Sequence, residues 1–272
     1  MKCRMLLGCF LALGLIATVA VADDSTSKPA GKSEPQGEMV ELFAAAKNGD
    51  IEVKMIVKDA TAGQVIITNK TKKPLTIQLP EVFAGVPVLA QIGGGGFGGG
   101  GNQGGNQNQN QGIGGGGGGF GGGGGGFGGG GGGGGGLFNV GPEKVGKIKF
   151  VAVCLEHGKI DPNPRVPYEM RPIESFVSKP DVIEVVRMLA KGEISQGSAQ
   201  AAAWNLNNEI SWNELGNKVG KKHLDGSTEP FFTANVLEVA VRSTREAAYR
   251  AAELAKKSPA KETKSATSEA SK

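Results

Sequence analysis

A glycine-rich segment divides this chain and most constrains what it can fold into. Residues 93–136 hold 32 of the chain's 47 glycines, together with Asn and Gln runs and isolated phenylalanines. No charged residue occurs between Glu81 and Glu143. Glycine loses more backbone entropy on folding than any other residue, and a glycine run buries almost no side chain in return. We therefore expect residues 93–136 to form a disordered loop.

A phosphate-binding loop is the functional alternative for these glycines. The pattern G-x-G-x-x-G occurs automatically within polyglycine, and here no succession of strand, glycines and helix frames it. The glycines therefore indicate a low-complexity insertion, and the sequence predicts no cofactor.

The N-terminus has the features of an export signal, residues 1–22. Lys2 and Arg4 precede an apolar run from Met5 to about Ala20, and Ala20-Val21-Ala22 is a cleavage pattern. An uncleaved membrane anchor is the alternative, because the run approaches the minimum length for a span. Cleavage predicts a mature chain that starts at Asp23, is periplasmic, cell-surface or extracellular, and has no membrane span.

The net charge argues against nucleic acid as a partner. The formal charge of the whole chain is +4, from 30 basic and 26 acidic residues. Removing Lys2 and Arg4 leaves 28 basic residues and a charge of +2. A nucleic-acid-binding protein usually carries a strongly basic patch or stripe. The expected partner is instead an unidentified macromolecule of the envelope or the extracellular space.

Cleavage of the signal leaves a single cysteine. Cys3 and Cys9 are removed with residues 1–22, so Cys154 has no disulfide partner within the mature chain. A free exposed thiol is a liability outside the cytosol. We expect Cys154 to be buried, modified or paired with another chain.

Alternating apolar and polar residues predict a β domain over residues 38–160, after a disordered leader, 23–37. It begins with a short helix, 38–48. The expected strands are 51–57, 65–68, 75–79, 86–92 and 147–156. In the last of these, Cys154 shares a face with apolar side chains, so it should point inward.

A helical region, 178–257, follows a Pro-rich connector, 161–177, and precedes a disordered tail, 258–272. Its helices are expected at 178–191, 195–207, from Ser211, and 233–256. The patterns Ser178-x-x-Asp181 and Ser211-x-x-Glu214 are typical of capping boxes. The predicted fold class is α+β: a small antiparallel β-sandwich or barrel, interrupted by the disordered glycine-rich loop and followed by C-terminal helices.

Several stretches resemble one family, the uncharacterised secreted proteins of planctomycete-type bacteria. They are FAAAKNGDIEVKMIVKD, NKTKKPLTIQLPEVFAGVPVLAQ, VCLEHGKIDPNPRVPYE, and AQAAAWNL with the following SWNEL. Together they span most of the chain from about residue 39 to 218. The resemblance implies a secreted location and this architecture, and no activity.

A local motif is similar to one in bacterial surface thioester domains. Gln200-Ala201-Ala202-Ala203-Trp204 resembles their Q-x-A-x-W pattern. In those domains a cysteine sulfur is bonded to a glutamine side-chain carbonyl with loss of ammonia. The resemblance implies that Cys154 is the sulfur donor and Gln200 the acyl partner. The alternative is an alanine-rich helix that packs closely on its neighbours.

Cys154 and His157 are also candidates for a nucleophile and its base. Residues three apart on a regular strand point to opposite faces, so this dyad requires a turn between them. The alternative is a buried cysteine acting as a small apolar residue beside an exposed histidine. A metal site at Cys154, Glu156, His157 and Asp161 lacks a closed set of Cys and His ligands, so no metal is predicted.

These features lead to one expected function with two alternatives. We expect an exported structural or interaction protein of the envelope or extracellular space, without catalytic activity. The first alternative is a covalent adhesion module with a Cys154–Gln200 thioester, and the second is a cysteine hydrolase using Cys154 and His157.

Overall fold

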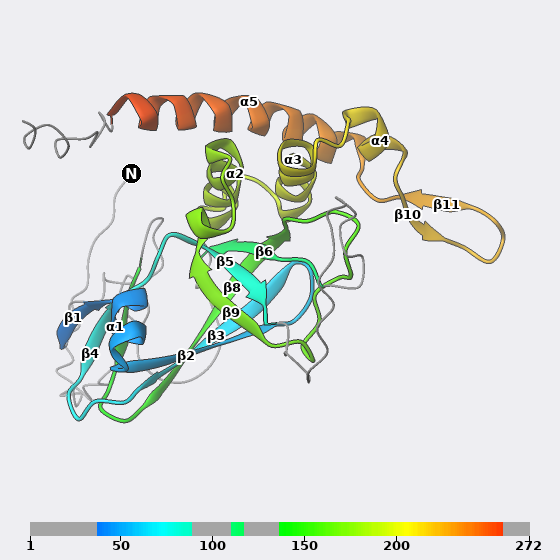
Figure 1. Cartoon of the computed structure of the whole chain (residues 1–272). Helices are drawn as coiled ribbons and strands as arrows, with labels where there is room; N and C mark the ends of the chain where they lie inside the picture. Colours follow the sequence, from blue (N-terminus) through cyan, green and yellow to red (C-terminus); the bar gives the residue numbers. More distant parts are fainter. Residues whose placement is uncertain (1–36, 89–109, 117–135, 258–272) are drawn as a thin grey trace, which may run out of the picture. The chain divides into compact units, whose positions relative to one another are not determined.

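The centre of the fold is a closed barrel of six antiparallel strands. The computed structural model describes residues 37–88, 110–116 and 136–257. Going around the barrel, the strands are β2 (Ile51–Val57), β3 (Ala62–Asn69), β8 (Val145–Cys154), β6 (Ile113–Gly116), β5 (Val82–Pro87) and β9 (Tyr168–Pro172), and β9 returns to β2 (Figure 1). The predicted α+β class is confirmed, and the β part is a barrel.

The hairpin of β2 and β3 shows how the sequence pattern builds the barrel wall. The two strands pair without interruption from Ile51↔Asn69 to Val57↔Gly63. Met55 and Val57 on β2, like Val65 and Ile67 on β3, are buried. These residues alternate with more exposed ones, which is the period of a sheet with one face toward a core.

Strand β6 corrects the prediction that residues 93–136 form a disordered loop. Residues 113–116 of this segment pair with β5 on one side and with β8 on the other. Ile113 is fully buried in the barrel. Residues 93–109 and 117–135 of the predicted loop lie outside the described residues.

Glycine is required in β6 because neighbouring elements approach it closely on both faces. A Cβ atom on Gly114 would lie 2.9 Å from Val186 Cγ2, and one on Gly116 only 2.3 Å from Ala190 Cβ. On the other face, a Cβ on Gly115 would lie 2.9 Å from Phe83 Cζ. Glycine within a strand often marks such a close approach. The packing that β6 permits therefore offsets the entropic cost of its glycines.

A small three-stranded sheet stands beside the barrel in the fold. Strand β4 (Leu75–Gln78) lies between β1 (Glu38–Glu41), which is parallel to it, and β7 (Leu137–Val140), which is antiparallel. Helix α1 (Leu42–Asn48) follows β1, and Glu41 caps it by accepting from the Ala44 N–H at 2.7 Å. The helix predicted from residue 38 therefore begins at Leu42.

The C-terminal helices pack on the barrel and on one another. They are α2 (Pro180–Ala190), α3 (Gln196–Asn208), α4 (Trp212–Asn217) and α5 (Ala234–Lys257). Helix α2 contacts β5, β6 and β8, α3 contacts β8, and α5 contacts both α2 and α3. Small buried side chains on α5, those of Ala240, Ser243 and Ala247, face this contact at helical spacing. Among the described residues, no helix is long and apolar enough to cross a membrane.

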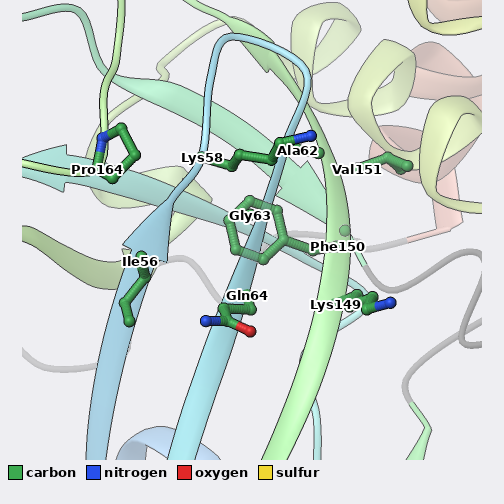
Figure 2. A pocket seen from close by; sticks show the side chains of 10 residues that line it. Ile56, Lys58, Ala62, Gly63, Gln64, Lys149, Phe150, Val151 and Pro164 are labelled. Carbon is green, nitrogen blue, oxygen red and sulfur yellow. The ribbon is translucent and has the colours of Figure 1, made fainter. Parts of the chain in front are cut away.

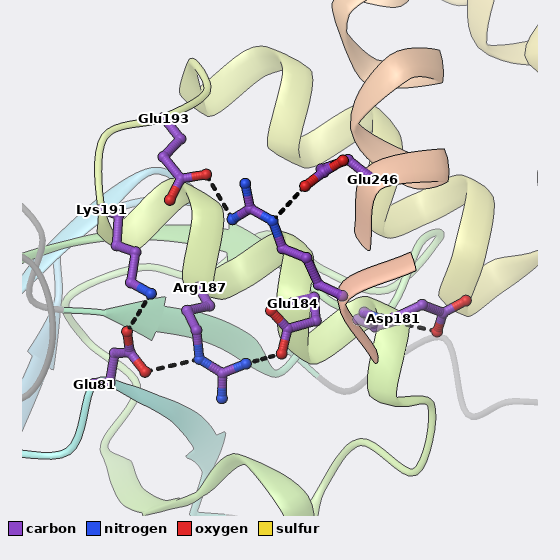
Figure 3. Close-up of polar contacts among 9 residues, drawn as sticks. Glu81, Asp181, Glu184, Arg187, Lys191, Glu193 and Glu246 are labelled. Atoms are coloured by element: carbon purple, nitrogen blue, oxygen red, sulfur yellow. Dashed lines mark hydrogen bonds and ion pairs between the residues drawn. The ribbon is translucent and has the colours of Figure 1, made fainter. Parts of the chain in front are cut away.

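Ion pairs connect the C-terminal part of α2 to Glu81, the residue before β5 (Figure 3). Arg187 Nε donates to Glu81 Oε2 at 2.7 Å, and Lys191 Nζ lies 2.9 Å from the other oxygen of that carboxylate. Arg187 also pairs with the buried Glu184 one turn earlier. These partly buried charges form pairs of opposite sign. A buried charge without such a partner would strongly destabilise the fold.

Two predicted boundaries differ from the structure. The strand expected at 86–92 is β5, which spans Val82–Pro87, and residues 89–92 lie outside the described residues. The expected connector, 161–177, contains β9 and a 3-10 turn, Ile173–Ser175. Because β9 pairs with β5 over five residues and closes the barrel, the barrel extends past the predicted limit at residue 160. The predicted signal, leader and tail lie outside the described residues, except Gly37.

One of the two predicted capping boxes is present. Ser211 caps α4: its Oγ accepts from the Glu214 N–H at 3.2 Å, and Glu214 Oε2 accepts from the Ser211 N–H at 2.9 Å. The prediction for Ser178 and Asp181 is wrong. Lys179 is the N-cap of α2, no side chain caps that helix, and Pro180 occupies its first turn, where a missing N–H costs nothing.

We expect Ser211→Ala to lower the free energy of unfolding by about 1 kcal/mol, because it leaves a helix-start N–H without its acceptor. Ser178→Ala is the matched control, since the exposed Ser178 caps nothing, and its effect should stay within about 0.5 kcal/mol. Urea denaturation of both variants measures the difference. Equal effects would contradict the assignment of the two caps.

Candidate functional site

Cys154, the first candidate residue, is the last residue of β8. It lies opposite Ile113 of β6, and only 1% of its surface is exposed. Ile148, Phe150 and Ala152, which share its strand face, are buried as well. The expected burial of the cysteine is therefore confirmed.

The surroundings of Cys154 keep its thiol protonated. Burial, with a smaller effect of the charges on Asp161 and Asp59, raises the pKa of Cys154 to about 12. Thiolates, rather than thiols, act as nucleophiles, and reactive cysteines have lowered pKa values. At neutral pH this side chain is a poor nucleophile.

We expect a thiol reagent to leave Cys154 unmodified in the native protein and to modify it once the chain is unfolded. The barrel excludes the reagent, and the raised pKa suppresses the thiolate. Mass spectrometry before and after denaturation, on the chain without residues 1–22, measures this. Rapid modification of the native protein would contradict the burial described above.

Gln200 on α3 joins its side-chain amide to the backbone of Cys154. The Cys154 N–H donates to Gln200 Oε1 at 2.8 Å, and Gln200 Nε2 donates to the Cys154 carbonyl oxygen, also at 2.8 Å. Gln200 is only 4% exposed. The structure therefore brings the two thioester candidates together, and the amide occupies the place of a neighbouring strand.

Other amides of α3, which the sequence analysis did not single out, continue this pattern. Strand β3 begins at Ala62, opposite Val151, so the last residues of β8 have no strand partner on that side. Gln196 Nε2 donates to the Ala152 carbonyl oxygen at 3.1 Å, and Asn207 Nδ2 donates to that of Leu155 at 2.6 Å. Gln196, Gln200 and Asn207 are spaced i, i+4 and i+11, on one helical face. This spacing of amides in an alanine-rich helix is the sequence signal that could have predicted the contacts of α3 with β8.

His157, the third candidate, takes part in an aromatic cluster. Its ring lies edge-on to Trp204 with centroids 4.7 Å apart, and its Nε2 is 3.0 Å from Lys218 Nζ. Partial burial, together with the charge of Lys218, lowers the pKa of His157. Phe231 belongs to the same cluster, with its ring centroid 5.6 Å from that of Trp204. The hydrogen bond of the imidazole is thus with Lys218, and Cys154 does not take part in it.

Polar groups near Cys154 are bonded mainly to one another. Gln111 Nε2 donates to Asp161 Oδ1 at 2.7 Å, and Tyr168 Oη donates to the Gln111 carbonyl oxygen at 2.9 Å. Burial raises the pKa of Tyr168. Within the described part of the chain, no three His, Cys, Asp or Glu side chains are grouped so that they could hold a metal ion.

A cavity of about 570 Å³ lies away from all three candidate residues (Figure 2). Its walls come from β2, β3, β8, the end of β6 and the loop after β8. The residues that line it are Ile56, Lys58, Ala62, Gly63, Gln64, Gly116, Lys149, Phe150, Val151 and Pro164.

The comparisons with known proteins leave the function to be argued from the structure. No protein-family model matches the chain, and no curated protein or solved structure matches it significantly. The resemblances to secreted planctomycete-type proteins and to thioester domains stay predictions.

Proposed function

We propose that the protein is an exported, non-enzymatic interaction protein that binds an envelope or extracellular macromolecule through one exposed hairpin. The hairpin consists of β10 (Val219–Lys222) and β11 (Thr228–Pro230). Every residue from Val219 to Phe231 is exposed. That observation carries the proposal.

The hairpin presents apolar side chains that its own chain does not cover. Leu224 at the tip is fully exposed, while Val219 and Phe231 at the base are 44% and 46% exposed. A two-stranded hairpin without a buried face is marginally stable by itself. In this proposal a partner covers the exposed apolar side chains at the tip and at the base of the hairpin.

The aromatic cluster around Trp204 holds the base of the hairpin. Lys218 Nζ lies 5.4 Å from the Trp204 ring centroid and bonds to His157, while Phe231 packs on the same indole. The Phe231 N–H donates to the Lys218 carbonyl oxygen at 2.7 Å and closes the hairpin. In this proposal His157 is an anchor of the hairpin, which leaves the cysteine hydrolase without a base.

Binding to isolated envelope material tests this function. We expect the purified mature protein to be retained and Leu224→Ser to reduce the retained amount at least about fivefold, as for a central apolar contact. Leu254→Ser is the matched control, since Leu254 is half-exposed on α5, and it should behave like the wild type. Equal retention of the two variants, or none of the wild type, would overturn the proposal.

Export is the second part of this proposal and is supported by the Ala20-Val21-Ala22 pattern. N-terminal sequencing of protein recovered from outside the cytoplasm should begin at Asp23. A chain that begins at Met1 and stays with the membrane would favour the anchor.

The covalent adhesion module remains a second candidate, because Gln200 contacts the backbone of Cys154. Its chemistry would join Sγ to the Gln200 side-chain carbonyl carbon and expel Nε2 with the thiol proton as ammonia. That step would remove the donor to the buried Cys154 carbonyl, so the bonding supports an intact amide.

Methylamine distinguishes the two candidates. It would cleave a thioester, add to Gln200 and release one thiol. For an interaction protein with an intact amide, the number of thiols measured after unfolding is the same with and without methylamine.

A further inference from the structure

The cavity in Figure 2 is built from side chains that stand next to one another across three strands. Ile56 on β2 pairs with Gln64 on β3, and Gln64 pairs with Lys149 on β8. Directly paired residues have Cβ atoms about 5 Å apart on the same face. One row across the sheet therefore presents an apolar side chain, an amide and an ammonium group.

Gly63, behind the polar row, leaves room for the ring of Phe150 inside the barrel. Gly63 pairs with Phe150, and a Cβ on Gly63 would lie 2.3 Å from Phe150 Cζ and 2.7 Å from the Ile56 carbonyl oxygen. The Phe150 ring thus occupies the position that a side chain at residue 63 would take. This ring is buried inside the barrel, and the apolar wall beside the polar row comes from Val151 and Pro164.

The polar groups of the row are available to a ligand. Within the described part of the chain, the side chains of Gln64 and Lys149 have neither a hydrogen-bond partner nor an ion pair. Lys58, at the rim, lies 3.8 Å from Asp59 and is largely exposed. Ligand sites of several hundred Å³ typically combine an apolar lining with a few such polar groups.

We propose that this cavity binds a small organic carboxylate with an apolar body. The carboxylate is held by the Lys149 ammonium and the Gln64 amide, and the body packs on Ile56 and Val151. The site is distinct from the hairpin, so the result of its test does not depend on the function proposed above.

Isothermal titration of the mature protein with 1-naphthoate tests the site, and 1-naphthalenemethanol serves as the uncharged probe of the same shape. We expect saturable binding of naphthoate and at least about tenfold weaker binding of the alcohol, because the charge-assisted bond is lost.

Substitutions on one face of β8 locate the site. Lys149→Gln should weaken naphthoate binding at least about tenfold, while leaving the alcohol unaffected. Lys147→Gln is the matched control: Lys147 is on the same strand face and exposed, but it does not line the cavity, so affinity should stay within about twofold.

Three outcomes would overturn the proposal. They are no saturable binding of naphthoate, equal binding of the alcohol, and equal weakening by the two lysine substitutions. Both lysines are exposed, and thermal unfolding confirms that the variants fold like the wild type before they are compared.

Discussion

Gly116→Val destabilises the barrel by about 3 kcal/mol or more, or prevents folding altogether. Its Cβ would lie 2.3 Å from Ala190 Cβ on α2 and 2.8 Å from the Glu81 carbonyl oxygen. Neither atom belongs to a flexible side chain that could move aside. Valine favours a strand by itself, so the loss would come from the contact between β6 and α2. Thermal and urea denaturation measure the effect.

Gly136→Val provides the control within the same glycine-rich region. No atom lies within 4 Å of a Cβ built on Gly136, and its φ is not in the left-handed region. We expect its effect on the free energy of unfolding to stay within about 0.5 kcal/mol. If Gly116→Val is as harmless as this control, β6 is not a packed strand of the barrel.

Gln200→Met lowers the free energy of unfolding by about 2–5 kcal/mol. Methionine fills a similar volume but leaves the Cys154 N–H and carbonyl oxygen without partners, and each buried unpaired group costs about 1–3 kcal/mol. Both groups belong to a residue that is 1% exposed, so water cannot replace the lost bonds. Chemical denaturation followed by circular dichroism gives the value.

Gln196→Met tests whether the loss follows the number of bonds. Gln196 is one turn earlier on α3, is half-buried and makes one bond to β8, to the Ala152 carbonyl oxygen. Its substitution should cost about 1–2 kcal/mol. An effect as large as that of Gln200→Met would mean that packing of α3, rather than the amide bonds, determines its stability.

The parts of the fold that follow a hydrophobic period were predictable from the sequence. Strands β2, β3, β4 and β8 alternate apolar and polar residues, and α2, α3 and α5 have recognisable ends. Strand β6 could not be found in this way, because its glycines have no side chains that could alternate. Strand β9 is short, follows Pro167 and ends at Pro172, and these prolines indicate a connector. Both strands are determined by partners far away in the chain.

The candidate site, too, was predictable from the sequence only in part. The alternation in β8 predicted that Cys154 is buried, and the motif around Gln200 suggested that the two residues meet. The alternation could not indicate that the edge of β8 is open beyond Val151, because that depends on where β3 begins. The role of the amides on α3 follows from this long-range feature.

The intact mass of the mature protein tests most directly whether Gln200 is a structural partner of Cys154 or its acyl partner. The account predicts the full mass of the chain from Asp23, together with one thiol that reacts after unfolding. A mass lower by one ammonia, with no reactive thiol until an amine is added, would contradict it.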